Sequence, residues 1–549
     1  MNKASLVLVN GRIATMDEKN PRVEALVISG ERIVYAGEDE TAKGYVTKET
    51  EDIDLKGRLV LPGFNDAHLH FLGGGLNFLR VDLRDCRSFE EIGERVKEKV
   101  NKMKPGSWIL GRGWDHTLFN QGKWPDKTFL DKIAPQNPVY LKRIDGHVGW
   151  ANSLTLQLSN IDRNSSSPEG GTIIRDALSG EPTGILLENA MQLVESMIPK
   201  PSFEEQTLAI KEAVKEANRF GITSIQDNSD LEVIEVYKKL LEKGELKVRV
   251  SEWLPLELVK KPEELKQIVQ SFPEQTNLLR PGLLKIMADG TLGSRTAFLF
   301  ESYSDEPGKS GVLLHEDEEL EEMVSLADES GFQVGIHAIG DKANHIVLDI
   351  YEKIHGLNPQ IEKRHRIEHC SLLKEADIPR FAKSGIVASV QPGFWSSDKK
   401  WLEQRLGKER MKGAYPFKSL LNSGTVLAFG TDWPVESLNP MIGFFSAVMR
   451  EVGARRAVPL PHSAGTVETH GHASLQNLTI EQAIRAYTLD SAYAEFQENE
   501  KGSLEIRKLA DLVVLSKDIF NIPAEEILET EVEMTILGGK IIFTRRGGV

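Results

Sequence analysis

Cysteine is almost absent from this 549-residue chain, which contains only Cys86 and Cys370. Two cysteines so far apart exclude both a disulfide framework and a thiolate-rich zinc site. Long apolar runs are missing as well: none approaches the roughly 18 residues of a membrane span, and the run at 6–9 is too short for a signal peptide. We therefore expect a cytoplasmic protein with no membrane partner, and expect His, Asp or Lys side chains to bind any metal.

Positive charge is also in deficit. The chain has 67 Lys and Arg against 82 Asp and Glu, a formal net charge of -15. An acidic surface opposes general binding to polyanions, so we expect no nucleic-acid partner. The remaining composition, 40% hydrophobic and 27% charged residues, is typical of a folded globular protein. A small molecule is the substrate that this composition favours.

Strand-like apolar runs alternate with helical patterns through the middle of the chain. Eight such runs occur, at residues 59–70, 221–227, 246–253, 282–289, 332–340, 364–370, 385–392 and 425–433. Alternating strands and helices are typical of a parallel sheet in the α/β class. Eight units predict a closed (β/α)8 TIM barrel over residues 59–499.

Both ends of the chain differ from this middle region, because they read as short β-hairpins. We expect residues 1–58 and 500–549 to pair as one small β-sandwich. The gap between the first and second barrel strands is too long for an ordinary connection. It contains a helix-like segment at 89–103 and a Trp-rich stretch, and predicts a cap or lid inserted over about 71–202.

Metal-ligand residues fall at the predicted strand ends. His68 and His70 are two positions apart on one strand, so both side chains point to the same face and can bind one cation. His337 ends the fifth run, His369 the sixth and Asp432 the eighth. Active sites of TIM barrels lie at the C-terminal ends of the strands. Five ligand-type residues at four strand ends therefore predict a metal site.

Lys285 lies inside the apolar fourth run, LLKIMADG. A buried ammonium needs a partner, because an unpaired charge is costly to remove from water. One interpretation is an ion pair with Asp289 or Asp432. The other is reaction of the neutral amine with carbon dioxide, which gives an anion able to bridge two divalent metals.

These motifs together resemble a known family. The strand PGFNDAHLH, Lys285 on the fourth strand, the strand-end residues His337, His369 and Asp432, and the flanking β-sandwich together resemble the amidohydrolase superfamily of metal-dependent hydrolases. The long insertion and the segments KIMADGTLGSRTA, HAIGDKAN and GTDWPV are similar to the subgroup that includes N-substituted formamide deformylase. The resemblance covers nearly the whole chain, and every ligand position of the pattern is filled.

The resemblance implies two divalent metal ions, with zinc expected, and a homo-oligomer of two or more copies. The implied ligands are His68, His70 and Asp432 for one ion, His337 and His369 for the other, and a carboxylated Lys285 with a hydroxide between them. In this arrangement the hydroxide attacks the substrate carbonyl, and Asp432 acts as the general base.

The leading hypothesis is hydrolysis of a non-peptide carbon–nitrogen bond in an amide, a cyclic amide or an N-formyl group. A deaminase or an ester or phosphotriester hydrolase is an alternative, since one barrel hosts several chemistries. A non-catalytic scaffold is a third reading. Lys285 argues against a single-metal deaminase, and the complete ligand set argues against a scaffold.

Four further residues are candidate substrate contacts. Asp289 and Arg295, in ADGTLGSRT, follow the fourth strand and either order a loop over the site or contact substrate. His147 and Trp114 lie in the predicted insertion, where they either line the substrate or pack in its core.

Overall fold

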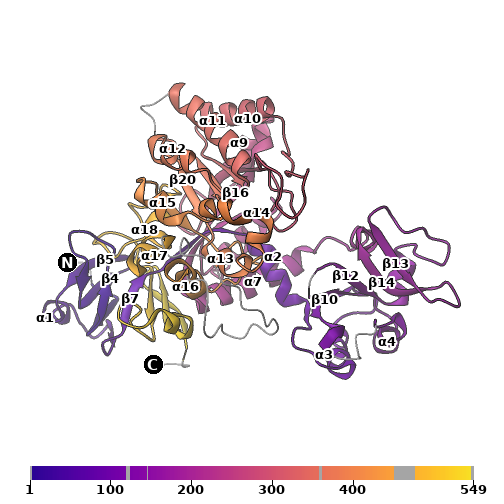
Figure 1. Cartoon of the computed structure of the whole chain (residues 1–549). Helices are drawn as coiled ribbons and strands as arrows, with labels where there is room; N and C mark the ends of the chain where they lie inside the picture. The colour runs from indigo at the N-terminus through magenta and orange to yellow at the C-terminus, as the bar shows by residue number, and fades with distance from the viewer. Residues whose placement is uncertain (1–2, 119–123, 145, 358–361, 451–475, 546–549) are drawn as a thin grey trace. The chain divides into compact units, whose positions relative to one another are not determined.

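The computed structural model describes residues 3–118, 124–144, 146–357, 362–450 and 476–545. The chain forms two compact units (Figure 1). The barrel unit comprises Met1–Gly73 and Ala213–Val549, and the inserted unit comprises Gly74–Glu212. Among the described residues, no helix combines the length and the apolar character needed to cross a bilayer.

Eight parallel strands form a barrel in the barrel unit, which confirms the predicted fold class. In order around the sheet they are β8 (Phe64–Leu69), β15 (Ile222–Asp227), β16 (Arg249–Pro255), β17 (Leu279–Met287), β18 (Val334–Ala338), β19 (Arg366–His369), β20 (Val387–Val390) and β21 (Leu427–Phe429). The loop after β21 meets the first strand: the Asp432 N–H donates to the His68 carbonyl at 2.7 Å, and the His70 N–H donates to the Trp433 carbonyl at 2.7 Å. We call this meeting point the seam.

The predicted first strand over residues 59–70 is two strands in the structure. β7 (Leu59–Pro62) pairs with β22 (Leu512–Leu515) of a flanking sheet, and β8 belongs to the barrel. Gly63 lies between them, where a Cβ would come within 2.2 Å of Thr223 Oγ1. Glycine thus lets the chain pass from one sheet to the next. Both strands are fully buried, so the apolar pattern gave no sign of the break.

Helices alternate with the barrel strands (Figure 1). In α8 (Val233–Glu242), for example, Val233, Val236, Tyr237 and Leu240 are buried at the three- and four-residue spacing of one helix face. Among the described residues, the other α-helices after β15 are α9 (Pro262–Gln270), α10 (Asp317–Glu329), α11 (Asp341–Leu357), α12 (Ile378–Lys383), α13 (Pro392–Asp398), α14 (Leu402–Arg410), α15 (Phe417–Asn422), α16 (Pro440–Val448), α17 (Ile480–Ala486) and α18 (Leu489–Tyr493).

Two small sheets in the barrel unit are built from the ends of the chain, and the second of them combines strands from both ends. One has the order β5 (Arg32–Gly37), β4 (Ala25–Ser29), β1 (Leu6–Val9), β6 (Glu51–Asp54), and the other has the order β24 (Lys540–Thr544), β23 (Val532–Leu537), β22, β7, β2 (Arg12–Ala14), β3 (Arg22–Val23). Leu8 and Ile53 from the first residues share one hydrophobic core with Leu512 and Ile536 from the last. The two chain ends therefore stabilise each other by burial of common apolar surface.

The inserted unit contains a six-stranded sheet that the sequence did not predict. Its order is β13 (Gly171–Arg175), β14 (Pro182–Glu188), β12 (Val148–Ala151), β11 (Val139–Arg143), β10 (Ile109–Trp114), β9 (Val81–Asp82). Its helices include α3 (Phe89–Val100), α4 (Lys127–Ile133) and α5 (Ser153–Leu158). Ile92, Trp114, Leu141 and Trp150 lie in its buried core.

Candidate metal centre

The C-terminal ends of the barrel strands bring the predicted ligands together. His68 lies in β8 and Lys285 in β17, while His337 and His369 lie in β18 and β19. Asp432 follows β21. All five are less than a tenth exposed. Parallel strands end on one face of a barrel, so side chains distant in sequence meet there.

Three of the predicted ligands, His68, His70 and Asp432, form a compact triad of metal donors. One donor atom each from His68, His70 and Asp432 lies within 4.8 Å of the other two. Asp432 Oδ1 is 3.1 Å from His70 Nε2 and 3.6 Å from His68 Nε2. Two imidazole nitrogens and one carboxylate oxygen are a donor set that suits zinc.

The hydrogen bond made by His70 determines which of its ring nitrogens can bind a cation at this triad. Its Nδ1 lies 2.7 Å from the carbonyl oxygen of Asn228, and a carbonyl only accepts, so Nδ1 carries the proton. In the neutral ring Nε2 is then also an acceptor, yet it faces the carboxylate of Asp432. Two acceptors at this distance repel unless a proton or a metal cation lies between them, and the raised pKa of His70 shows that this position attracts positive charge. The triad therefore fits a bound cation.

His337 and His369 form a second pair of donors beside the triad. Their ring centroids are 4.5 Å apart, and the His369 ring lies 4.9 Å from that of His68. His337 Nε2 lies 3.1 Å from the Gly290 carbonyl, so Nδ1 is the nitrogen of this ring that is left to bind a metal. His369 Nδ1 lies 2.7 Å from Gln391 Oε1, so Nε2 is the nitrogen of this ring that is left to bind a metal. Each ring is thus oriented by its other nitrogen, as is usual for metal-binding histidines.

Lys285 is buried close to these rings. Its Nζ donates to the carbonyl of Ile286 at 2.9 Å. Burial lowers the pKa of Lys285 to about 8, although the negative charges of Glu368 and Asp432 act in the opposite direction. At neutral pH this amine loses its proton far more readily than an exposed lysine does.

The pKa directions of the other ligands also suit metal binding. Burial lowers the pKa of His68, His337 and His369, that of His369 to about 4, so these rings are neutral at pH 7. Burial alone would raise the pKa of Asp432, but the hydrogen bond to His70 and the surrounding imidazoles lower it overall. For His70, burial lowers the pKa, but Asp432 more than offsets this and raises it. The site therefore offers three neutral imidazoles and an ionised carboxylate, and the His70 ring beside that carboxylate favours positive charge.

Asp66 fixes the seam where two of the ligands meet, and the sequence analysis did not identify it. Its carboxylate accepts hydrogen bonds from the Thr431 N–H at 2.9 Å, the Thr431 hydroxyl at 2.6 Å and the His68 N–H at 3.3 Å. Asp432 follows directly, in the left-handed region with φ of 55°. Such a conformation costs about 1–3 kcal/mol and persists only where the surroundings hold it. Asp66 supplies part of that support.

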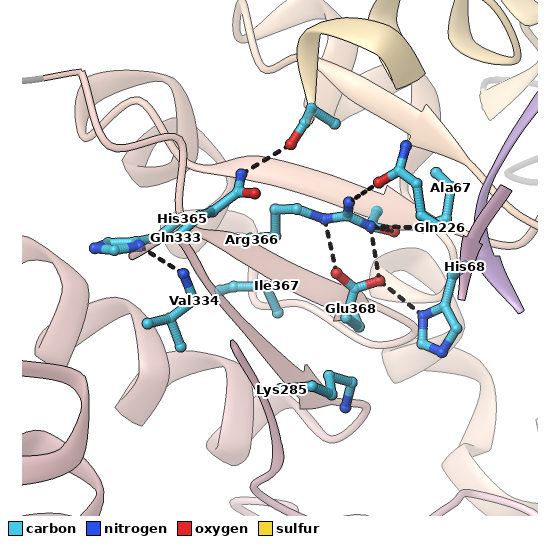
Figure 2. Close-up of polar contacts among 12 residues, drawn as sticks. Ala67, His68, Gln226, Lys285, Gln333, Val334, His365, Arg366, Ile367 and Glu368 are labelled. Atoms are coloured by element: carbon cyan, nitrogen blue, oxygen red, sulfur yellow. Dashed lines mark hydrogen bonds and ion pairs between the residues drawn. The ribbon is translucent and has the colours of Figure 1, made fainter. Parts of the chain in front are cut away.

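Arg366 and Glu368 are two further buried residues that the sequence analysis missed (Figure 2). Glu368 Oε2 lies 2.7 Å from His68 Nδ1. Burial alone would raise the pKa of Glu368, but the charge of Arg366 and the hydrogen bond from His68 lower it well below its ordinary value. Arg366 and Glu368 occupy alternate positions of the buried strand in RHRIEHC. A charged residue inside a buried strand is the signal that identified Lys285, and it could have identified these two residues as well.

Asp289 and Arg295 are both engaged with the protein. The carboxylate of Asp289 accepts hydrogen bonds from the backbone N–H groups of Phe298, Ile339 and Gly340, at 2.8–3.0 Å. Arg295 forms a two-point ion pair with Asp305, at 3.1 and 3.0 Å.

His147 and Trp114 lie in the inserted unit. The Trp114 ring is fully buried, and its indole N–H donates to the Leu141 carbonyl at 2.9 Å. His147 is exposed, and its Nδ1 lies 2.9 Å from a carboxylate oxygen of Glu188.

The profile of a family described as Amidohydrolase family matches residues 51–543. LONG AFTER FAR-RED 3 from Arabidopsis thaliana is 35% identical over 554 residues, which cover 98% of this chain and 92% of that protein. N-substituted formamide deformylase from Arthrobacter pascens is 27% identical over 563 residues, or 99% of each chain. The crystal structure of an uncharacterized metal-dependent hydrolase from Pyrococcus horikoshii gives a TM-score of 0.77 at 32% identity, covering 95% of this chain and 99% of that one.

Proposed function

Because the chain belongs to the amidohydrolase family of metal-dependent hydrolases, we propose that it hydrolyses a non-peptide carbon–nitrogen bond in an amide, a cyclic amide or an N-formyl group. One observation carries the proposal: four imidazoles, a carboxylate and a buried lysine converge at the C-terminal ends of the barrel strands. The match to a formamide deformylase along 99% of both chains supports the N-formyl group among these substrates.

Two divalent cations would be held by these side chains, and zinc suits their imidazole and carboxylate donors. We assign one ion to His68, His70 and Asp432 and the other to His337 and His369, and Lys285, buried near Asp432, would help to hold both. Such ions, when bound, lower the pKa of water and polarise a substrate carbonyl. The site residues therefore need only hold and orient the reactants and move one proton.

Lys285 would bridge the two ions as a carbamate. Its neutral amine attacks carbon dioxide, a nitrogen–carbon bond forms, and one proton leaves to solvent. The cationic side chain is thereby replaced by an anion with two oxygen donors. The lowered pKa of Lys285 favours this step because it raises the fraction of neutral amine.

Asp432 would act as the general base. Its ionised carboxylate accepts a proton from the attacking water, and a bond forms between the water oxygen and the carbonyl carbon. When the carbon–nitrogen bond breaks, Asp432 returns the proton to the departing nitrogen, so that the amine leaves neutral. The backbone hydrogen bond from the Asp432 N–H to His68 holds this residue in place throughout.

The substrate-contact predictions for Asp289, Arg295, His147 and Trp114 stay predictions. The three backbone hydrogen bonds of Asp289 and the ion pair of Arg295 favour a loop-ordering role for both residues. A cytoplasmic location and a homo-oligomer also stay predictions, and light scattering would measure the latter.

The decisive experiment measures metal content by mass spectrometry on protein purified without chelator in bicarbonate buffer. We expect about two equivalents per chain, a sharp fall in Lys285→Ala, and hydrolysis of a member of an amide and N-formyl panel. Lys501→Ala is the matched control, because Lys501 is an equally buried lysine whose Nζ is 2.8 Å from Glu495 Oε1 instead of among the ligands. One equivalent that is insensitive to Lys285→Ala would contradict the bridged pair. Ammonia release from aminated heterocycles without amide hydrolysis would favour a deaminase.

A further inference from the structure

An ion pair lies inside the barrel beside the ligand His68 (Figure 2). Arg366 and Glu368 are two positions apart on β19, so they point to the same side of the strand, and neither is exposed. The Arg366 Nε donates to Glu368 Oε1 at 2.8 Å, and Nη2 donates to Oε2 at 3.2 Å. This two-point geometry fixes the plane of the carboxylate.

The guanidinium group of Arg366 is itself held from several strands. Its Nη2 donates to the Ala67 carbonyl on β8 and to the Ser389 hydroxyl on β20, both at 2.8 Å. Its Nη1 donates to Gln226 Oε1 on β15. The ring of Trp253 on β16 lies 5.0 Å from its central carbon. Arg366 is therefore immobilised, and it immobilises Glu368 in turn.

Glu368 also contacts His68 through a hydrogen bond. Oε2 lies 2.7 Å from Nδ1, and a carboxylate already paired with arginine accepts here, so Nδ1 carries the proton. The lone pair of His68 is then on Nε2, the atom that faces Asp432 in the triad. His70 and His369 have neutral acceptors instead, a backbone carbonyl and the amide of Gln391. Of these three, only His68 is oriented by a full negative charge.

We propose that Glu368, clamped by Arg366, is a positioning residue that fixes the ring and the tautomer of His68 for the cation of the triad. The inference rests on the proposed metal-dependent function. A carboxylate behind a ligating histidine makes the ring a stronger donor as well as orienting it. Glu368 therefore sets the affinity of one of the two ions without touching it.

The test compares wild type with E368Q. A glutamine offers one oxygen in place of two and carries no charge, so it cannot keep all three hydrogen bonds that Arg366 and His68 donate to Glu368, and its amide N–H groups face at least one of these donors. We expect zinc affinity at the triad, measured by competition with a chromophoric chelator, to fall by about 10- to 100-fold. The second ion should stay bound, so metal content in dilute chelator should fall from two equivalents towards one.

Two further variants separate positioning from general stability. R366M/E368Q leaves no unpaired buried charge, and it frees the glutamine oxygen to accept from His68 alone, so zinc affinity should partly recover. D511N breaks another buried two-point ion pair, in which Arg249 contacts Asp511 at 2.6 and 2.8 Å away from the ligands. It should lower the melting temperature of the metal-free protein and leave zinc affinity unchanged. If E368Q does not fold, the double variant carries the test.

Equal zinc affinities in E368Q, D511N and wild type would overturn the proposal and leave the Arg366–Glu368 pair with a structural role only. A double variant no better than E368Q would also contradict the orienting role. A wild-type protein that binds no metal would instead refute the proposed function itself, and with it this inference.

Discussion

Replacement of Asp66 by alanine should loosen the seam between the first and last barrel strands. The carboxylate of Asp66 accepts three hydrogen bonds, two of them from the backbone N–H groups of Thr431 and His68. Alanine offers no acceptor. Because Asp66 is fully buried, water does not take its place without further opening of the structure.

The size of the effect follows from these contacts. Each buried backbone N–H left without an acceptor costs about 1–3 kcal/mol, so the two together cost about 2–6 kcal/mol. D66N should lose less, since its amide oxygen still accepts one or two of the bonds. A local loss of 2 kcal/mol corresponds to about a 30-fold rise in the population of the open seam.

Amide hydrogen exchange followed by mass spectrometry measures this opening. In D66A, the peptide that contains Asp432 should exchange at least about 30-fold faster than in wild type, and D66N should lie between the two. Peptides from β14 in the inserted unit serve as the internal reference and should not change. Unchanged exchange at Asp432 in a folded D66A protein would refute the assignment of Asp66 as the support of the seam.

Further predictions concern the base, the fold and the metal. Asp432→Asn should lower kcat by about 10²- to 10⁴-fold in steady-state assays, as expected for loss of a general base, and a smaller loss would remove Asp432 from that role. Gly63→Ala should destabilise the barrel unit by more than about 1 kcal/mol in urea titrations, because its Cβ meets Thr223, and Gly63→Ala in a T223G background should be milder. Burial raises the pKa of Asp398 to about 6. Protonation of Asp398 thus stabilises the fold, fully below about pH 4, and this contribution is lost as the pH rises through 6. Asp398→Asn should therefore flatten the dependence of the free energy of unfolding on pH between these values. An unaltered pH dependence in Asp398→Asn would contradict this assignment. Chelation should lower the melting temperature of wild type and added zinc should restore it, whereas a melting temperature indifferent to both would argue against a resident metal.

The strand ends were predictable from the sequence because two simple rules apply to them. The alternation of apolar runs and helices indicates a parallel barrel, and the polarity of a parallel strand decides which of its ends faces the active site. His337 and His369 could therefore be placed on one face although 31 residues separate them. The fold class is confirmed, and the structure brings the four histidines and Asp432 together.

Features that depend on partners distant in sequence were not predictable. Glu368 and Arg366 look like one charged pair within a strand, and only the folded chain brings His68 to that pair. Asp66 was passed over because its role depends on the loop after β21, which a single strand pattern does not reveal. The division at Gly63 was hidden because the strands on both sides of it are equally buried.

The seam also has a topological consequence. Asp66 and Thr431 are 365 positions apart in sequence, and the triad joins the same two strands. A cation held there would be a reversible cross-link between the two ends of the barrel, comparable with a disulfide that closes a very long loop. Closing such a loop restricts the unfolded chain more than closing a short one, although the cost grows only with the logarithm of its length. Metal supply would then regulate the lifetime of the folded barrel as well as its activity.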